Sequence, residues 1–495
     1  MTKPKPPHPE ETRILPNIDH IVYLMFENRS LDNLLGWLYD KPPKNMIPPI
    51  PHGPQYDGLR EKTYKLPLKP HYWSPVTYYP IKKGVGKNGF TVPNLDPNEA
   101  YPNVMNQLFG DAEHTVKVPP QEAKPALMQG FLQDFDADDD TWNETLQITD
   151  TYTPSELPVL NGLAKQYAVS DRWYSSMPTQ TNPNRAFALC GTSLGRLKNK
   201  NIMALEQFKT PTIWNALAAK KTEMGIYFHE TWHDNQCFTQ YTFPNMNTVD
   251  KSLLDIRKID APDMGFYARA QAGNLPAFSY IEPKWGYGAG PHTMRQGNDY
   301  HPPTDVRYGE KLLHNVYTAL KSNPKAWERT LLIVTFDEHG GTYDHHAPAW
   351  GAVNPGDEKS RNSAFKFNLY GVRVPTLLVS PQVPEGTVFR EPLDSKYPFD
   401  HTSILATLLK WRGIDPAKAN LFDRVASAPT FEAVVNTRVI NKGANIPNPG
   451  DNFDIDACED LFEGIPSSIV RYISSIAKTR QRVIQLIEDY KAHQT

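Results

Sequence analysis

Three short apolar segments, each followed at once by polar residues, constrain the fold of this chain more than any other feature. They are HIVYLMF at 20–26, followed by ENRS; TLLIVTF at 330–336, followed by DEHGG; and VPTLLV at 374–379, followed by SP. Segments of this length, rich in β-branched and aromatic residues, are typical of strands buried on both faces of a parallel sheet. Apolar residues with helical spacing in RYGEKLLHNVYTALKSN at 307–323 predict an amphipathic helix ahead of the second segment. The sequence therefore predicts an α/β fold around a largely parallel central sheet.

The composition excludes some classes of partner. With 52 basic and 55 acidic residues the formal charge is 52 − 55 = −3, so no nucleic-acid partner is expected. The chain shows neither the apolar stretch of a signal peptide at its N-terminus nor a segment apolar enough for a transmembrane span. We therefore expect a soluble protein, either cytoplasmic or exported by a route that needs no cleaved signal. Cys190, Cys237 and Cys458 are too scattered for a disulfide framework and are expected to be free thiols.

Candidate site residues directly follow the first two apolar segments, where α/β proteins place their ligands. Glu27 and Asn28 follow the first segment, and Asp337, Glu338 and His339 follow the second. The glycine pair of DEHGG allows close approach of the backbone. Carboxylate and amide oxygens suit Ca²⁺, Mg²⁺ or Mn²⁺, and nearby imidazoles also admit Zn²⁺. A helix cap or a solvated turn is the alternative interpretation.

A second candidate region is SSMPTQTNPNRAFALCGTS at 175–193, where hydroxyl residues precede a helix-forming run. A hydroxyl at a helix N-terminus lies beside free N–H donors, which favours binding of a phosphoryl group. Arg185 is expected to bind the oxygens of that group bidentately. A proline-rich turn with a capping threonine is the alternative.

Six motifs, in this order along the chain, resemble the phosphoesterase family of bacterial and plant non-specific phospholipases C and related acid phosphatases. They are FENRSLDNLLGWL at 26–38, TNPNR at 181–185, YIEP at 280–283, GNDYHPPTDV at 297–306, FDEHGGTYDHHAP at 336–348 and FDHTS at 399–403. The resemblance implies an alkaline-phosphatase-like, three-layer α/β/α sandwich. Because the motifs are spread so widely, residues 18–430 are predicted to form one catalytic domain, between a proline-rich arm at 1–17 and an extension at 440–495.

The resemblance also implies roles for individual residues. It implies that Glu27, Asn28, Asp337 and Glu338 bind a divalent metal ion, with Ca²⁺ or Zn²⁺ favoured over Mg²⁺ or Mn²⁺. The nucleophile falls on Thr181, with Thr179 as its rival. Three histidines also match family motifs: His301 is expected near the phosphate or the leaving group, while the roles of His339 and His345 stay open.

The implied activity is that of a phospholipase C acting on glycerophospholipids such as phosphatidylcholine and phosphatidylethanolamine. Metal coordination would lower the pKa of the Thr181 hydroxyl so that it attacks phosphorus, and His301 would protonate the departing alkoxide. Diacylglycerol leaves, and water releases the phosphorylated head group from a phospho-threonine. A phosphomonoesterase of the acid-phosphatase branch and a non-catalytic lipid-binding module are the alternatives.

One position departs from the family pattern. In DPNEAYPNVMNQLFG at 96–110, Glu99 stands where phospholipase C members commonly carry a histidine. A simple rearrangement of the site is the favoured interpretation; binding a second metal, acting as an acid or contacting a cationic head group are the alternative roles for Glu99. His229 and His233, in YFHETWHDN, are candidates for the missing imidazole. Asp400 and His401 are expected beside the active site, with a helix cap as the competing role for Asp400.

A lipid substrate requires contact with a membrane interface. The aromatic segment HYWSPVTYYP at 71–80 and an amphipathic helix predicted at 466–490 are the candidates. Ordinary loop packing is the favoured interpretation of the aromatic segment. The helix is expected to dock on the domain or on a second copy of the chain, which would give a homo-oligomer.

Overall fold

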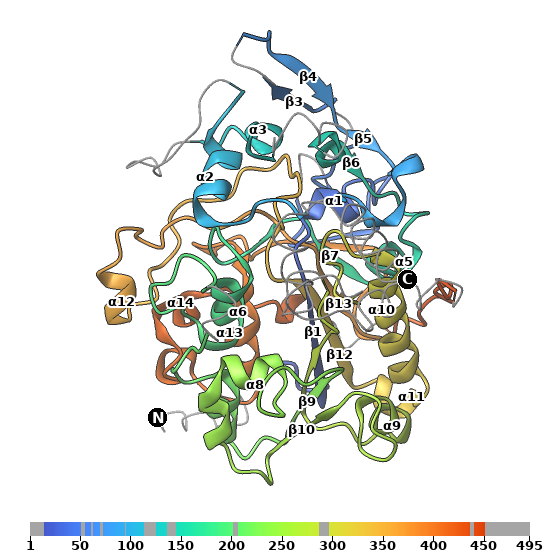
Figure 1. The fold of residues 1–495 in the computed structure, drawn as a ribbon. Coiled ribbons are helices and arrows are strands. Elements are labelled where there is room, and N and C mark those ends of the chain that lie inside the picture. The colour runs from blue at the N-terminus through green and yellow to red at the C-terminus, as the bar shows by residue number, and fades with distance from the viewer. Residues whose placement is uncertain are drawn as a thin grey trace, which may run out of the picture.

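The computed structural model of the protein describes residues 14–50, 55–60, 63–69, 73–94, 96–112, 125–135, 145–200, 206–286, 297–435 and 440–450. Within this part of the chain, nine strands form one central sheet in the order β10, β9, β11, β1, β12, β13, β7, β14 and β2 (Figure 1). In that order they span Leu254–Lys258, Met224–Phe228, Phe278–Glu282, His20–Phe26, Thr330–Phe336, Thr376–Val379, Ala168–Ser170, Thr387–Phe389 and Asn45–Ile47.

The prediction of a largely parallel sheet is confirmed. β1 lies between β11 and β12 and runs parallel to both, with Phe26 opposite Phe336. The third apolar segment forms β13, which is antiparallel to β12 and to β7 and so differs from the expectation for that segment. Between β12 and β13 the chain contains only one short helix, α12 (Glu358–Arg361). Without a crossover helix to carry it back, the chain re-enters the sheet from the end at which β12 leaves it.

Helices cover both faces of the sheet, which confirms the three-layer α/β/α architecture (Figure 1). One face carries α5 (Pro158–Gln166), α9 (Phe266–Ala272), α10 (Val306–Lys321) and α11 (Pro324–Trp327). The other carries α6 (Thr181–Cys190), α13 (His401–Trp411) and α14 (Phe422–Ser427), and α13 also contacts α7 (Ile213–Ala218). The predicted amphipathic helix is α10, whose leucines and Val316 are buried and whose N-cap is Asp305.

Apart from the apolar core around the central sheet, another apolar cluster lies beyond the carboxyl ends of β1 and β12. It includes the strand β3 (Lys65–Leu68) and the helices α2 (Tyr101–Phe109) and α3 (Phe131–Phe135). β3 pairs with β4 (Thr77–Pro80) as an antiparallel hairpin, which Figure 1 shows at the top of the molecule. The proline- and tyrosine-rich region between β1 and α5 therefore has its own core, which packs over the end of the sheet.

Some expectations fall outside the described residues. These are the roles of the arm at 1–13, of Cys458 and of the amphipathic helix at 466–490. Cys190 and Cys237 are buried free thiols, as predicted. In the described part of the chain, no helix has the length and apolar character needed to cross a bilayer.

Candidate active site

The carboxyl ends of β1 and β12 bring together the acids predicted from the sequence. Because Phe26 and Phe336 are register partners, Glu27 and Asp337 follow side by side. The backbone N–H of Asn28 donates to Asp337 Oδ1 at 3.1 Å. Glu27, Asn28, Asp337 and Glu338 are all buried, none of them more than 4% exposed. Two segments that lie about 310 residues apart in the sequence therefore form one buried acidic cluster.

The glycine pair after Glu338 allows the close packing expected from the sequence. At Gly340, with φ of 59°, a Cβ atom would lie 2.2 Å from the Asn28 carbonyl oxygen. At Gly341, with φ of 64°, a Cβ atom would lie 2.6 Å from Pro97 Cβ. Neither contact is sterically possible for another residue, and positive φ adds backbone strain. The two glycines therefore bring both Asn28 and the segment containing Glu99 against the acids.

Asn28 connects the acids to the proposed nucleophile. Its side-chain Oδ1 accepts a hydrogen bond from Thr181 Oγ1 at 3.2 Å, and its Nδ2 lies 2.9 Å from His301 Nε2. Thr181 is the first residue of α6, and among the described residues its backbone N–H has no protein partner. The hydroxyl and the N–H of Thr181 thus both stand at the N-terminus of a helix, beside the acids.

The rival threonine is placed differently. Thr179 is buried, and its hydroxyl donates to the Leu197 carbonyl oxygen at 2.6 Å. Thr181 is partly exposed and bonded to Asn28. The geometry therefore favours Thr181 as the hydroxyl that a substrate can reach.

His301 is held as an acceptor. Its Nδ1 lies 2.6 Å from the Pro302 carbonyl oxygen, so Nδ1 carries the proton. Burial lowers the pKa of His301 to about 4, which leaves the ring neutral near pH 7 and Nε2 without a proton. The expected role as proton donor to the leaving alkoxide would require this imidazole to gain a proton in the reacting complex.

Arg185 does not face the substrate side as expected from the sequence. Its side chain is 1% exposed, and Nε lies 3.2 Å from Asp337 Oδ2 and 3.5 Å from Glu27 Oε1. The other two guanidinium nitrogens donate to Tyr280 Oη and to the carbonyl oxygens of Met25 and Phe26. Since all three nitrogens are engaged with protein groups, Arg185 provides a counter-charge beneath the acids, and a bidentate contact with phosphate is not available to it here.

The buried acids carry more negative charge than the protein compensates. Burial and the nearby Asp337 raise the pKa of Glu27 and of Glu338 well above the usual range. Burial also raises the pKa of Asp299 to about 6 and that of Glu99 to about 7. Oε1 of Glu338 is buried without a hydrogen-bond partner. A fully buried carboxylate oxygen without a donor, among acids that share one arginine, fits the binding of a hard cation.

Two further predicted residues lie against this cluster. His339 Nε2 is 2.7 Å from Gln107 Oε1, and its Nδ1 is 3.3 Å from Glu338 Oε2. His401 Nε2 is hydrogen-bonded to the Asp337 carbonyl oxygen at 2.6 Å. Both imidazoles therefore fix the loop that carries the acids.

Asp400 has the competing role that the sequence left open. It is the N-cap of α13, and its carboxylate accepts from the Thr402 N–H. The same carboxylate pairs with Arg424 at 3.1 Å. Asp400 thus anchors the helix whose first residue is His401.

The remaining candidates lie at the edge of the cluster. Oε1 of Glu99 accepts a hydrogen bond at 3.0 Å from Gln180, the residue before Thr181. His229 is hydrogen-bonded to the Glu282 carbonyl oxygen and to Asn298, and His233 pairs with the exposed Asp234. Within the described chain, no hydrogen bond joins either histidine to Thr181 or Asn28, so neither replaces an imidazole there. Glu99 is the candidate beside the nucleophile, and its role stays a prediction.

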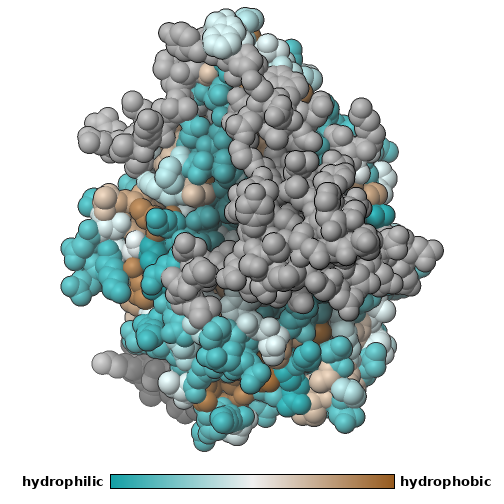
Figure 2. Space-filling view, in the orientation of Figure 1, coloured by the Kyte–Doolittle hydropathy of each residue, from teal (hydrophilic) through white to brown (hydrophobic). Residues whose placement is uncertain are grey.

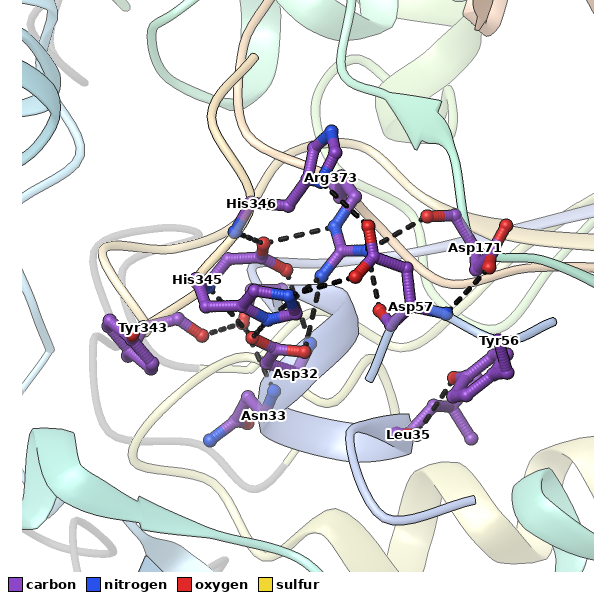
Figure 3. A network of polar contacts seen from close by, with 12 residues as sticks. Asp32, Asn33, Leu35, Tyr56, Asp57, Asp171, Tyr343, His345, His346 and Arg373 are labelled. Carbon is purple, nitrogen blue, oxygen red and sulfur yellow. Dashed lines mark hydrogen bonds and ion pairs between the residues drawn. The ribbon is translucent and has the colours of Figure 1, made fainter. Parts of the chain in front are cut away.

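His345 belongs to a polar network that includes Asp32 of α1 (Leu31–Leu35) (Figure 3). Its Nδ1 is 2.6 Å from Asp32 Oδ2 and its Nε2 is 3.1 Å from Asp57 Oδ1. Arg373, which is 0% exposed, donates to Asp32 at 3.2 Å and to Asp344 at 3.0 Å. No hydrogen bond in the described structure links His345 to Thr181, and its place among the catalytic histidines stays a prediction.

The same network contains a group of acids and imidazole that could hold a metal ion. Among the described residues, the ligand atoms of Asp32, Asp344 and His345 all lie within 4.8 Å of one another. The acids after β1 and β12 do not form a second group this tight. However, Arg373 already donates to both aspartates, and His345 is bonded to Asp32. The guanidinium of Arg373 thus neutralises these aspartates in place of a metal ion. Glu338 Oε1, in contrast, has no hydrogen-bond donor.

The His345 contacts predict a pH-dependent stability. Asp32 and Asp57 raise the pKa of His345 to about 9, against an ordinary value near 6.5. Because the folded pKa is the higher one, the stabilisation is fully present below about pH 6.5 and is lost as pH rises through about 9. We expect the urea concentration at the midpoint of unfolding to decrease as the pH is raised from 7 to 10. The His345→Gln variant should be less stable at pH 7 and show a smaller fall; an equal fall in both proteins would contradict the assignment.

Sequence reasoning missed three residues that position the site or the network around His345. Asp299 accepts hydrogen bonds from the backbone N–H groups of Gly286 and His301, and its carbonyl oxygen accepts from the Glu27 N–H. Its only signal was its position two residues before His301. Gln107, on α2, and Arg373, ahead of β13, carried no local signal, because their partners lie hundreds of residues away.

The fold and this site define the class of protein. Acids and one hydroxyl gather at the carboxyl ends of the strands of a mostly parallel α/β/α sheet, where α/β enzymes place their active sites. A model of the phosphoesterase family matches residues 18–414, and the chain belongs to that family.

Named relatives are similar over most of the chain. Non-specific phospholipase C6 of Arabidopsis thaliana is 33% identical over 424 residues, which are 85% of this chain and 72% of that protein. Phospholipase C B of Mycobacterium tuberculosis (strain ATCC 25618 / H37Rv) is 24% identical over 94% of this chain and 86% of that protein. Among solved structures, an alkaline phosphatase superfamily protein from Vibrio parahaemolyticus is 17% identical over 54% of this chain and 63% of that chain, with a TM-score of 0.31.

Proposed function

We propose that this protein is a metal-dependent phospholipase C that hydrolyses glycerophospholipids to diacylglycerol and a phosphorylated head group. The observation that carries the proposal is the contact of Thr181 Oγ1 with Asn28, which places a reachable hydroxyl beside the buried acids Glu27, Asp337 and Glu338. The relatives named phospholipase C, similar over most of the chain, support the substrate class.

Residues of the chain itself would orient the nucleophile, hold the acids in place and bind the phosphoryl group. Asn28 orients the Thr181 hydroxyl, and Arg185 holds Glu27 and Asp337 in place beneath it. The Thr181 N–H, at the start of α6, is available to an oxygen of the phosphoryl group.

Attack by the hydroxyl forms a bond from Thr181 Oγ1 to phosphorus as the bond from phosphorus to the glycerol oxygen breaks. The unprotonated Nε2 of His301 would accept the proton that the hydroxyl loses and return it to the glycerol oxygen, which leaves as diacylglycerol. Water then attacks phosphorus, and the bond from phosphorus to Thr181 Oγ1 breaks to release the phosphorylated head group and the free hydroxyl.

A divalent cation fits the acids through Glu338 Oε1, which is buried without a donor, and through the oxygens of Glu27, Asn28 and Asp337. Such an ion would lower the pKa of a coordinated hydroxyl and polarise the phosphoryl oxygens. Oxygen ligands favour Ca²⁺, whereas His301 and His339 beside the acids also admit Zn²⁺, so either ion is proposed ahead of Mg²⁺ or Mn²⁺.

Substrate comparison tests the proposal. Phosphatidylcholine, phosphatidylethanolamine and p-nitrophenyl phosphate are each assayed with chelator and after metal is added back. We expect diacylglycerol from both phospholipids, abolished by chelator and restored by metal. Hydrolysis of the monoester alone would instead assign the protein to the acid-phosphatase branch, and metal-independent binding without any hydrolysis would indicate a lipid-binding module.

The metal site can be tested without an activity assay. Glu338→Gln removes the charge from the oxygen that has no donor. We expect the affinity for the activating metal, measured by calorimetric titration, to fall by at least about 10- to 100-fold, the range seen when even a residue behind a ligand is lost.

A buried glutamate elsewhere provides the matched control. Glu310 is 1% exposed and accepts from the N–H groups of Val159 and Leu160. Glu310→Gln should lower stability but leave metal affinity unchanged. Equal metal affinity in wild type and Glu338→Gln would show that Glu338 is not a ligand.

A further inference from the structure

We infer that the β3–β4 hairpin is a docking surface for a lipid bilayer that carries anionic head groups. The hairpin projects from the end of the molecule toward which β1 and β12 run, the end that holds Thr181 and the acids (Figure 1). The need for such a surface rests on the proposed function, because a phospholipid must be reached at its interface.

Aromatic side chains on this hairpin are exposed to solvent. Trp73 is 82% exposed and Tyr78 is 59% exposed, whereas loop packing was the favoured interpretation of this segment. Trp and Tyr combine an apolar ring with a polar atom and favour the boundary between water and lipid. Figure 2 shows residues of intermediate hydropathy beside hydrophilic ones at this end of the molecule.

The hairpin is held firmly from behind. Leu66 and Leu68 on β3 are 0% exposed and belong to the apolar cluster formed with α2 and α3. β4 is hydrogen-bonded to β3, with Tyr78 opposite Pro67, and its own side chains are mostly exposed. β3 therefore packs the hairpin against the apolar cluster, while β4 presents Tyr78 to solvent.

The charge of the hairpin indicates which kind of surface it binds. The described residues at 63–69 and 73–83 contain four basic residues, Lys65, Lys69, Lys82 and Lys83, and no acid, so they carry +4. Lys82 is paired with Asp150 at 2.9 Å, which leaves the exposed Lys65 and Lys83 on this surface to meet an outside anion. The whole chain carries −3, so the rest of the sequence carries −3 − 4 = −7. A basic, aromatic surface on a protein of net negative charge complements an anionic bilayer.

Vesicle flotation in the presence of chelator, which stops hydrolysis, tests the inference. The full chain is mixed with vesicles of phosphatidylcholine with or without about 30% phosphatidylglycerol. We expect tighter binding to the anionic vesicles, weakened by high salt. Replacing both aromatics, Trp73→Ala with Tyr78→Ala, should weaken binding at least about tenfold, and Lys65→Gln should weaken binding to anionic vesicles by about fivefold.

Controls separate docking from catalysis. Leu393 is 80% exposed outside the hairpin, so Leu393→Ala should bind vesicles as the wild type does. The double aromatic variant should hydrolyse a water-soluble short-chain phosphodiester at the wild-type rate but lose activity on vesicles. If wild type hydrolyses neither substrate, the proposed function fails, while flotation still decides the docking surface.

Three results would overturn the inference. The first is unchanged vesicle binding by the double aromatic variant. The second is an equal loss of activity on the soluble ester, which would assign the hairpin to support of the site. The third is a change of oligomeric state in gel filtration without a change in vesicle binding, which would assign the surface to a second copy of the chain.

Discussion

Thr181→Ala should reduce kcat/KM for phosphatidylcholine by about 10⁴-fold or more, the scale of loss when a catalytic nucleophile is removed. The hydroxyl is the group that would bond to phosphorus, and Asn28 orients it beside Glu27 and Asp337. Without that hydroxyl no covalent intermediate forms. Diacylglycerol release under initial-rate conditions, with saturating metal, measures the effect.

Two matched variants distinguish the nucleophile from its surroundings. Thr181→Ser keeps a hydroxyl and should retain substantial activity and form a phospho-enzyme. Thr179→Ala removes a hydroxyl that donates to the Leu197 carbonyl oxygen, so it should affect stability and leave the chemistry intact. Metal-dependent hydrolysis by Thr181→Ala at the wild-type rate would refute the assignment.

Arg373→Met should lower the free energy of unfolding by about 3–5 kcal/mol, the range for removal of one partner from a buried ion pair. Arg373 is 0% exposed and lies between Asp32 and Asp344, which are also 0% exposed (Figure 3). Its Nη1 also donates to the carbonyl oxygens of Asp57 and Asp171. The methionine fills a similar volume but leaves two carboxylates buried beside His345 alone. Urea unfolding at pH 7 measures the loss.

A more exposed arginine of the same region serves as the control. The Arg172 side chain is 35% exposed and lies 3.8 Å from Asp57. Arg172→Met should cost less than about 1 kcal/mol, because water screens an exposed pair. A loss for Arg373→Met as small as that for Arg172→Met would show that the network does not depend on the buried guanidinium.

The sequence predicted the strands next to the site because the relevant signal is local. A mostly apolar run of seven residues followed by polar residues can be recognised without knowing what packs against it, so β1 and β12 have the predicted bounds. The direction of β13 depends on the path of the chain between 337 and 375, which no local pattern specifies. Its apolar character was therefore recognised and its orientation was not.

Arg185 illustrates why a correct motif does not specify the contact of a side chain. Its position on the first turns of α6 was recognised together with Thr181. Whether its guanidinium faces substrate or protein depends on Glu27, Asp337 and Tyr280, which belong to three different strands or strand ends. The buried acids attract it inward, so the charge lies under the site.

By itself, the sequence determined the α/β class, the two central strands and the acids that follow them, because apolar runs and the residues beside them are contiguous. Only the tertiary structure decided that Thr181 reaches Asn28 while Thr179 does not, that His345 joins Arg373 and Asp32, and that Trp73 is exposed. Arg373 and Asp32 are 341 residues apart. The partner of a buried charge is set by which distant segments fold together, and neither residue's neighbours in the sequence encode that.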